Sequence, residues 1–213
     1  MISIKKHMDG WTHDAPAVSS LHFYRSLLAA VGKCSHRAVP DLGHELERKL
    51  SKLDSALEKD PLTGLANRRG FEERLDARMR TSGPFCLILI DLNGFKAVND
   101  RLGHLAGDDV LKNFAASLRA QFPPADLVAR WGGDEFAAIV NGGRNDAEAL
   151  VDRIRRSDIG ECKINGPKQT INVAVQPSIG LAEWDGSEKG PSLLARADHA
   201  MYQGKQLMKT RRA

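Results

Sequence analysis

The chain has 213 residues, with 31 Lys and Arg against 27 Asp and Glu, and carries a formal net charge of +4. This length suits one domain of about 150 residues plus an extension, and the mild charge excludes a strongly basic nucleic-acid-binding protein. We find no signal peptide and no apolar run near the roughly 18 residues that a membrane span needs. The three cysteines are widely spaced, as suits a reducing compartment. We therefore expect a cytoplasmic protein with no nucleic-acid partner and no membrane span.

Residues 1–59 are expected to form a helical extension that serves dimerisation or regulation. Apolar residues at helical spacing predict a first helix over 18–31. A second helix carries four leucines spaced four, three and four residues apart, as in a heptad: Leu46, Leu50, Leu53 and Leu57. Two predictions stay open for this helix, namely a parallel coiled-coil pair or an amphipathic helix packed on its own domain. No motif identifies the signal or partner that the extension receives.

From residue 60 onward, the apolar pattern predicts alternating helices and strands. Apolar residues at helical spacing predict helices over 70–80, 110–121 and 147–156. Such an alternation is typical of an α+β fold, in which helices pack mostly on the faces of a sheet.

The strands are expected in three parts of this region. The unbroken apolar run 85–90 predicts a central buried strand that stops at Asp91. Two further strands are expected over 169–176 and 178–184, and Pro177 confines their junction to a sheet edge or bulge.

Residues 130–136 (RWGGDEF) predict a hairpin with acidic residues at its turn. Apolar residues lead into and out of the segment, and its two glycines fall where a tight hairpin turn requires positive φ. A solvated acidic turn is the alternative explanation for Asp134 and Glu135, because surface turns favour Asp. A further acid at a strand end, Asp91, favours a magnesium site, since Mg²⁺ binds carboxylates together with substrate phosphates.

A short helix is expected to begin at Gly94 and to end near Gly103. Backbone amides at the start of a helix point outward and bind phosphate groups. Next to the acidic residues, this helix start predicts a site for a nucleoside triphosphate.

Four segments, in this order, resemble the GGDEF-domain diguanylate cyclases of bacterial signalling. They are residues 60–69 (DPLTGLANRR), 91–108 (DLNGFKAVNDRLGHLAGD), 132–136 (GGDEF), and 178–182 with 197–205 (SIGLA and ADHAMYQGK). The resemblance implies a domain over residues 60–213 with a central, mainly antiparallel sheet, similar to the palm of nucleotide cyclases. It also implies condensation of two GTP molecules into cyclic di-GMP with release of pyrophosphate. The expected catalyst is a homodimer in which each domain holds one GTP and Mg²⁺ or Mn²⁺ assists.

The resemblance assigns catalytic roles to the acids that match the family's motifs. Asp91 and Asp134 are expected to bind the metal with help from the Leu92 carbonyl. Glu135 is expected to bind a second metal or to activate the attacking hydroxyl.

Guanine recognition is expected from Asn99 and Asp108. A carboxylate accepts hydrogen bonds from both N1–H and the 2-amino group of guanine, and an amide serves the acceptor edge. This carboxylate disfavours adenine, which has no N1–H. Without the family context, an N-cap on a helix that begins at Val110 is the alternative role for Asp108.

Further substrate contacts are expected around the phosphates and the base. The backbone amides of Gly94, Phe95 and Lys96 are expected to bind phosphate, and Lys205 is expected to assist them. The glycines Gly132 and Gly133 leave room for the nucleotide. His104 is expected to orient the loop or to contact the base.

The chain departs from the family pattern after this lysine. Many relatives continue with Gly-Arg-Asn, whereas this chain has Lys209, which lacks the bidentate fork of arginine. We therefore expect weaker binding of the triphosphate.

The chain also departs from the family's product-binding Arg-x-x-Asp motif. Asp126 is present, but Pro123 stands at the arginine position. Without a guanidinium to hold the product, we expect no inhibition at that site. The alternative to an active enzyme is an idle module that binds GTP or cyclic di-GMP and controls a partner. The intact acids and guanine contacts favour the enzyme.

Overall fold

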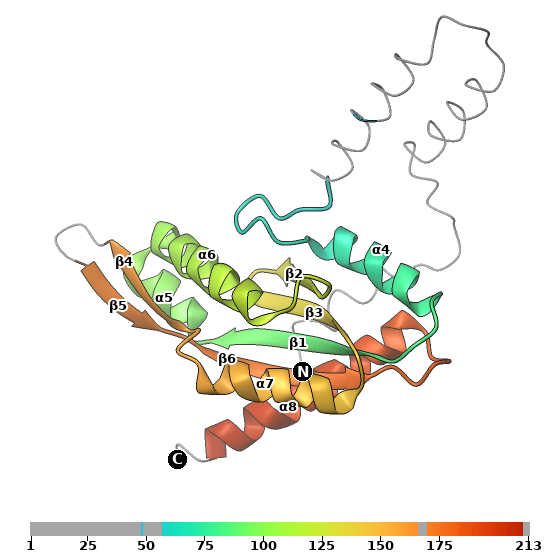
Figure 1. Cartoon of the computed structure of the whole chain (residues 1–213). Helices are drawn as coiled ribbons and strands as arrows, with labels where there is room; N and C mark the ends of the chain where they lie inside the picture. Colours follow the sequence, from blue (N-terminus) through green and yellow to red (C-terminus); the bar gives the residue numbers. More distant parts are fainter. Residues whose placement is uncertain (1–47, 49–56, 166–169, 211–213) are drawn as a thin grey trace, which may run out of the picture.

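Four antiparallel strands form the central sheet in the order β2-β3-β1-β6 (Figure 1). The structure, a computed structural model, describes residues 48, 57–165 and 170–210, without the side chains of residues 165 and 207–210. The strands are β1 (Phe85–Asn93), β2 (Leu127–Gly132), β3 (Glu135–Asn141) and β6 (Gln176–Glu183). β1 lies between β3 and β6, which confirms the prediction of a central buried strand in a mainly antiparallel sheet.

Helices alternate with these strands along the chain. They are α4 (Arg68–Met79), α5 (Phe95–Leu102), α6 (His104–Gln121), α7 (Arg144–Arg156) and α8 (Gly190–Thr210). A separate hairpin of β4 (Glu161–Asn165) and β5 (Thr170–Ala174) extends beyond the main sheet (Figure 1). None of the helices within the described ranges is long and apolar enough to cross a membrane.

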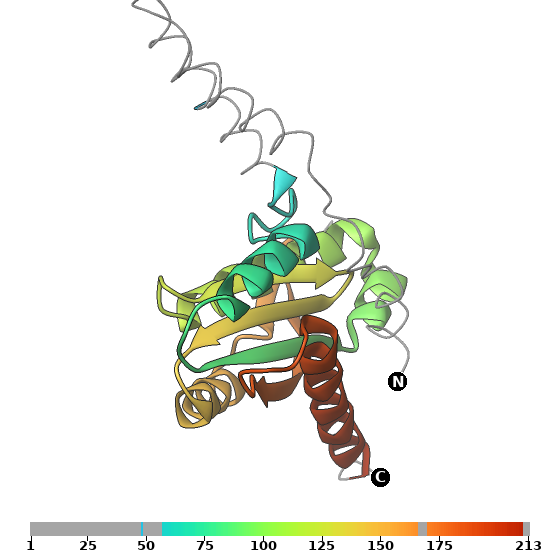
Figure 2. The same cartoon turned by 90° about the vertical axis from the view of Figure 1, so that its right-hand side faces the viewer.

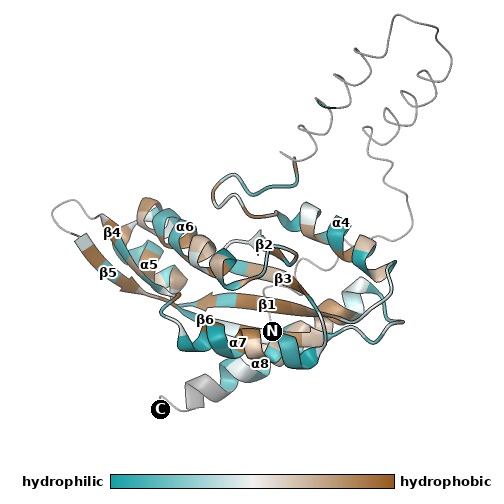
Figure 3. Ribbon diagram, viewed as in Figure 1, coloured by the Kyte–Doolittle hydropathy of each residue, from teal (hydrophilic) through white to brown (hydrophobic). Residues whose placement is uncertain are grey.

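Successive side chains of β1 face opposite sides of the sheet, because the side-chain period of a strand is two. Ile88 and Ile90 belong to a core that contains residues of α5, α6 and α7, whereas Leu87 and Leu89 pack with α4 and α8. In Figure 2, α4 and α8 lie across the same face of the sheet. Figure 3 shows the apolar residues along β1 and β3 between these helical layers. The sheet is thus covered on both faces, as the predicted α+β fold requires.

Close packing of α8 on β6 depends on Gly180. A methyl group at this position would lie 2.1 Å from the Ala197 carbonyl oxygen and 2.5 Å from the Met201 amide nitrogen. Only glycine allows the helix backbone to approach the strand so closely. Lys205 follows Met201 by about one helical turn, so this contact also determines where that lysine lies.

Two predicted boundaries differ in ways that affect the site. The helix expected from residue 110 begins at His104, directly after Gly103 at a φ of +85°. Asp108 therefore lies inside α6, and its alternative role as an N-cap is wrong. The strand expected to stop at Asp91 continues to Asn93, because β6 pairs with Leu92 and Asn93.

The predicted junction at Pro177 also shifts. β5 ends at Ala174, and Pro177 lies inside β6, opposite Leu92. Hydrogen-bonded and non-hydrogen-bonded pairs alternate in an antiparallel ladder, and the bond from the Trp184 N–H to the Phe85 carbonyl places Pro177 in a non-bonded pair. The missing N–H therefore removes no ladder bond, and β6 is an edge strand, as the proline predicts.

The N-terminal extension lies almost wholly outside the described residues, and this includes the first helix and three of the four heptad leucines. Leu57 is described and is 50% exposed. The coiled coil remains a prediction.

Candidate active site

Two of the predicted acids face each other at the end of the central strand. Asp91 on β1 pairs directly with Glu135 on β3, and their exposed fractions are only 8% and 3%. The Leu92 N–H donates to the Asp134 carbonyl oxygen at 3.2 Å. Because the N–H and C=O of one strand residue point toward the same neighbouring strand, the Leu92 carbonyl also faces residues 132–136, the signature turn.

Lys205 joins this group from α8. Its Nζ lies 2.6 Å from Oδ1 of Asp91, and the side chains of Lys205 and Asp91 are 32% and 11% exposed. Burial raises the pKa of Asp134 above the ordinary carboxyl value, and the neighbouring Asp91 charge adds to this effect. Lys205 and Arg130 both act on Asp134 with their positive charges, and the oxygen atoms gathered at this strand end suit a bound cation.

The buried oxygen donors fit Mg²⁺ or Mn²⁺. In the described part of the chain, no three His, Cys, Asp or Glu side chains form a ready-made metal cluster. Mg²⁺ commonly takes only one or two carboxylates and completes its octahedron with substrate phosphates and water. The residues that would hold the ion are Asp91, Asp134, Glu135 and the Leu92 carbonyl.

The signature turn has one glycine with positive φ, not two. Gly133 has a φ of +54°, whereas Gly132 ends β2 in extended conformation. The prediction of positive φ is therefore wrong for Gly132. A methyl group at either glycine would meet no described atom within 4 Å, which leaves both faces open for a ligand.

An arginine that the sequence interpretation overlooked fixes this turn. Arg130 donates to the Gly133 carbonyl from Nε at 3.0 Å and from Nη2 at 2.8 Å. Its Nη1 lies 3.2 Å from Oδ1 of Asp60, and Oδ2 of the same carboxylate accepts hydrogen bonds from the amide and hydroxyl of Thr63. Burial opposes the charge of Asp60, but the Thr63 bonds and the Arg130 charge outweigh it and lower the pKa. The first residues of the domain are thereby tied to the signature turn.

The two predicted guanine-binding residues lie on helices that pack against each other, Asn99 on α5 and Asp108 on α6. A methyl group at Gly107 would lie 1.9 Å from Oδ1 of Asn99, so the contact depends on glycine. Within the described residues, this buried Asn99 oxygen has no hydrogen-bond partner. Buried polar atoms are normally satisfied, so the Asn99 oxygen is available for a ligand.

The predicted phosphate-binding amides lie at the start of α5. Gly94 has a φ of +85° and precedes Phe95, the first residue of the helix. The first amides of a helix have no intrahelical acceptor. The amides of Phe95 and Lys96 can therefore donate to phosphate oxygens.

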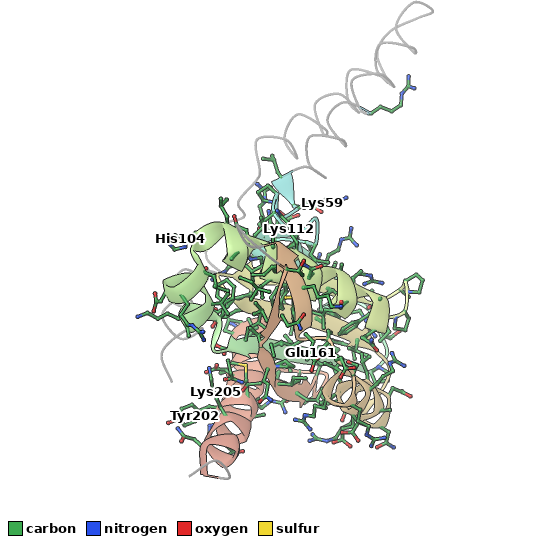
Figure 4. All side chains as sticks on the ribbon, turned by 90° about the vertical axis from the view of Figure 1, so that its left-hand side faces the viewer. Lys59, His104, Lys112, Glu161, Tyr202 and Lys205 are labelled. Carbon is green, nitrogen blue, oxygen red and sulfur yellow. The ribbon has the colours of Figure 1, made fainter. Side chains whose placement is uncertain are left out.

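Two other predicted contacts are placed less favourably or are not described. His104 is exposed and lies apart from Lys205 in Figure 4, at the tip of α6. Lys209 lies in the last turn of α8, and its side chain is outside the described part of the structure.

Asp126, which stands at the aspartate position of the family's product-binding motif, is hydrogen-bonded within the fold. Asp126 is 7% exposed, and its Oδ1 accepts from the Asn141 amide at 3.0 Å and from Asn141 Nδ2 at 3.1 Å. Arg119 holds the same loop through the carbonyls of Pro123 and Asp126, at 2.6 and 2.8 Å. The Asp126 carboxylate is thus committed to the end of β3.

An antiparallel sheet whose open end gathers carboxylates, a lysine and a helix start is typical of the palm-like domains of nucleotide cyclases. A family model described as "Diguanylate cyclase, GGDEF domain" matches residues 57–211. The chain therefore belongs to the GGDEF family.

Characterised relatives share this domain. The chain is 38% identical to diguanylate cyclase DgcP of Pseudomonas aeruginosa over 68% of its own length and 22% of that protein. It is 36% identical to the response regulator PleD of Caulobacter vibrioides over 73% of its length and 36% of that protein. The chain thus spans well under half of these longer relatives.

Solved structures show the same fold. The coiled coil and GGDEF domain of DgcB from Caulobacter crescentus, solved in complex with c-di-GMP, matches with a TM-score of 0.71 at 28% identity, covering 85% of this chain and 95% of that one. The GGDEF domain of PA1120 from Pseudomonas aeruginosa matches with a TM-score of 0.63 at 38% identity, covering 70% and 89%.

Proposed function

We propose that this protein is a diguanylate cyclase that condenses two GTP molecules into cyclic di-GMP and two pyrophosphates. The observation that carries the proposal is the convergence of Asp91, Glu135 and Lys205 at the open end of β1. This cluster lies where the chain turns into α5, the helix that carries Asn99. Idle members of the family generally lose signature acids or guanine contacts, and both sets are present here.

Substrate binding is divided between two helices and the strand end. Asn99 and Asp108 bind the guanine edge, and the carboxylate selects guanine over adenine because it needs two donors. The amides of Phe95 and Lys96 bind phosphate oxygens, and Lys205 adds a positive charge. A bound Mg²⁺ or Mn²⁺ supplies Lewis-acid stabilisation of the charge that develops on the phosphates.

The chemical step joins two nucleotides held by two subunits. The 3′-oxygen of one GTP forms a bond to the α-phosphorus of the other, and the bond from that phosphorus to the β-phosphate oxygen breaks. Glu135 accepts the hydroxyl proton, and pyrophosphate leaves with the electron pair. A second, symmetric step closes the ring.

Because each domain holds half of the reaction, a homodimer is required. A monomer should bind GTP yet turn over poorly, so the specific rate should rise with protein concentration. Inhibition through the degenerate motif should be absent, because Pro123 offers no charge and Asn141 occupies the Asp126 carboxylate.

The test is incubation of the protein with GTP and Mg²⁺, followed by identification of the products by mass. We expect cyclic di-GMP from the wild type and none from Asp134→Ala. Asp152→Ala, at an exposed acid of α7, is the matched control and should stay active. A dimer that binds GTP but makes no product would instead indicate that the protein is a nucleotide-binding module and not an active cyclase.

Asp108 and its neighbour allow a sharper test of base choice. Asp108→Ala should weaken GTP binding, whereas Asp109→Ala removes only a surface pair with Lys112 and should bind normally. Equal turnover of ATP and GTP by the wild type would contradict the assignment. Cyclic di-GMP that binds tightly to the wild type but not to Asp126→Ala would contradict the absence of a product site.

A further inference from the structure

The side chain of Asn93 fastens the end of β1 to β6. Its Nδ2 donates to the Gln176 carbonyl oxygen and to Ser178 Oγ, both at 2.8 Å. Ser178 is only 1% exposed. The family resemblance gives Asn93 no ligand role, yet the structure engages both of its amide hydrogens.

These residues share one face of the sheet with the proposed metal ligands. Asp91 pairs with Glu135 on one side and with Ser178 on the other, and Asn93 lies two residues beyond Asp91. Directly paired residues and residues two apart in a strand point to the same face. This is the face from which α8 brings Lys205 to Asp91. The Asn93–Ser178 bond therefore runs beside the Asp91 carboxylate.

The end of β1 is also held by the backbone, because pairing with β6 continues to Asn93, which lies opposite Gln176. Gly94 turns the chain into α5 directly after Asn93. On the opposite side, the bond from the Leu92 N–H to the Asp134 carbonyl is 3.2 Å long and leads to a turn that itself belongs to the site. The Asn93 side chain thus adds two hydrogen bonds to the backbone pairing that holds residues 91–93 against β6.

We propose that Asn93 and Ser178 are positioning residues for the metal-binding end of β1. They hold the Asp91 carboxylate and the Leu92 carbonyl in the orientation that binds the metal together with GTP. This inference rests on the proposed function. Loss of a group that orients a metal ligand commonly weakens metal affinity about 10- to 100-fold, although the group never touches the ion.

Asn141 provides a matched control at the opposite end of the sheet. Its Nδ2 also donates two hydrogen bonds, to the Ala125 carbonyl at 2.9 Å and to Asp126 Oδ1 at 3.1 Å. It pairs with Phe85, at the far end of β1 from the acids. Its Oδ1 also accepts from Arg78 Nε at 3.1 Å. Asn93→Ala and Asn141→Ala therefore each remove two hydrogen bonds donated by Nδ2, and Asn141→Ala removes the Arg78 bond as well, but only Asn93 lies beside the proposed metal site.

Three quantities are measured for the full chain and for each variant. They are the melting temperature, the affinity for GTP by calorimetry at increasing Mg²⁺ and in EDTA, and the Mg²⁺ concentration that gives half-maximal turnover. We expect Asn93→Ala to raise the Mg²⁺ midpoint about 10-fold in both binding and turnover, with GTP binding in EDTA unchanged. Ser178→Ala removes one of the two acceptors of Asn93 Nδ2 and should raise the Mg²⁺ midpoint less. Asn141→Ala should lower the melting temperature and leave the Mg²⁺ midpoint at the wild-type value.

The outcomes separate the two proposals. If Asn93→Ala and Asn141→Ala lose stability alike and the Mg²⁺ midpoint stays unshifted, the role of Asn93 is structural and this inference is overturned. If Asn93→Ala does not fold, Ser178→Ala decides by the same readouts. A wild type that neither binds GTP in a Mg²⁺-dependent manner nor turns it over would refute the proposed function itself.

Discussion

Lys205 Nζ lies 2.6 Å from Asp91 Oδ1, so one ion pair joins the last helix to the central strand at the proposed metal site. This ammonium partly neutralises the buried carboxylates. When a metal and a triphosphate bind, the lysine is expected to leave Asp91 to the cation and to turn to the phosphates. The pair therefore links the state of the site to the packing of α8.

Replacement of Lys205 by methionine tests this link. Lys205→Met removes one charge-assisted contact to the triphosphate and should weaken GTP binding on the order of 10-fold. It also leaves the Asp91 carboxylate without its counter-charge, so the metal-free variant should melt at a lower temperature. Mg²⁺ should stabilise the variant more than the wild type. Lys112→Met, at an exposed surface pair, is the control, and an equal response of both variants would contradict the prediction.

Asp134→Asn should stabilise the metal-free protein while it abolishes turnover. Burial and the Asp91 charge hold the pKa of Asp134 above its ordinary value. A carboxyl with a raised folded-state pKa stabilises the fold below its unfolded pKa, near 4, and this contribution is lost as pH rises through the folded pKa. At pH 7 the ionised group is therefore a cost, which an isosteric amide removes.

Thermal unfolding in EDTA measures the effect. We expect the Asp134→Asn variant to melt about 1–4 °C above the wild type at pH 7, corresponding to roughly 0.5–1 kcal/mol. The difference should shrink as pH falls toward 4, because the wild-type carboxyl becomes protonated. A variant that melts below the wild type at pH 7 would show that Asp134 is not under electrostatic strain.

The sequence predicted the parts of the site that reside in short contiguous motifs. The apolar run before Asp91 indicated the central strand, and the segment around Glu135 indicated the hairpin that pairs with it. Contacts between distant segments were missed, because periodicity does not show which side chain meets which. Arg130 with Asp60 is one such contact, 70 residues apart in the chain. Asn93 with Ser178 is another, because the predicted strand stopped at Asp91 and did not include Asn93.

The start of helix α6 shows a different limitation. Apolar spacing begins at Val110, whereas the helix begins at His104. The sequence pattern missed the first turn because this turn carries few apolar contacts. Leu105 is 84% exposed there, so no buried stripe marked this turn. Tertiary packing of α5 on α6, not local pattern, sets this boundary.

The Arg130 contacts predict that the signature turn needs arginine itself. The pair with Asp60 is only 15–16% exposed, so Arg130→Ala should lower the free energy of unfolding by about 1–3 kcal/mol. Turnover should fall on the order of 10-fold, because the Gly133 carbonyl loses both of its donors.

Two further variants test this prediction. Urea unfolding measures the stability of each variant, and initial rates measure its turnover. Arg130→Lys keeps the charge near Asp60 but cannot bond Gly133 twice, so stability should recover more than turnover. Arg144→Ala breaks an exposed pair with Glu148 and should change stability by less than about 0.5 kcal/mol. Full activity of Arg130→Ala would contradict the prediction that the signature turn needs Arg130.

Gly107→Ala should disrupt the proposed guanine site, since the added methyl group would lie 1.9 Å from Asn99 Oδ1 and 3.2 Å from the Phe95 ring. To relieve the overlap, Asn99 must rotate or α5 must move away from α6, and either change displaces the amide that is proposed to contact the acceptor edge of guanine. Calorimetry should show GTP affinity reduced at least 10-fold, with the Mg²⁺ dependence of the residual binding unchanged. The control is Gly204→Ala on α8, where the nearest atom lies at 3.9 Å and alanine should raise stability by roughly 0.5–1 kcal/mol. Wild-type GTP affinity in the Gly107→Ala variant would show that guanine does not bind between these helices.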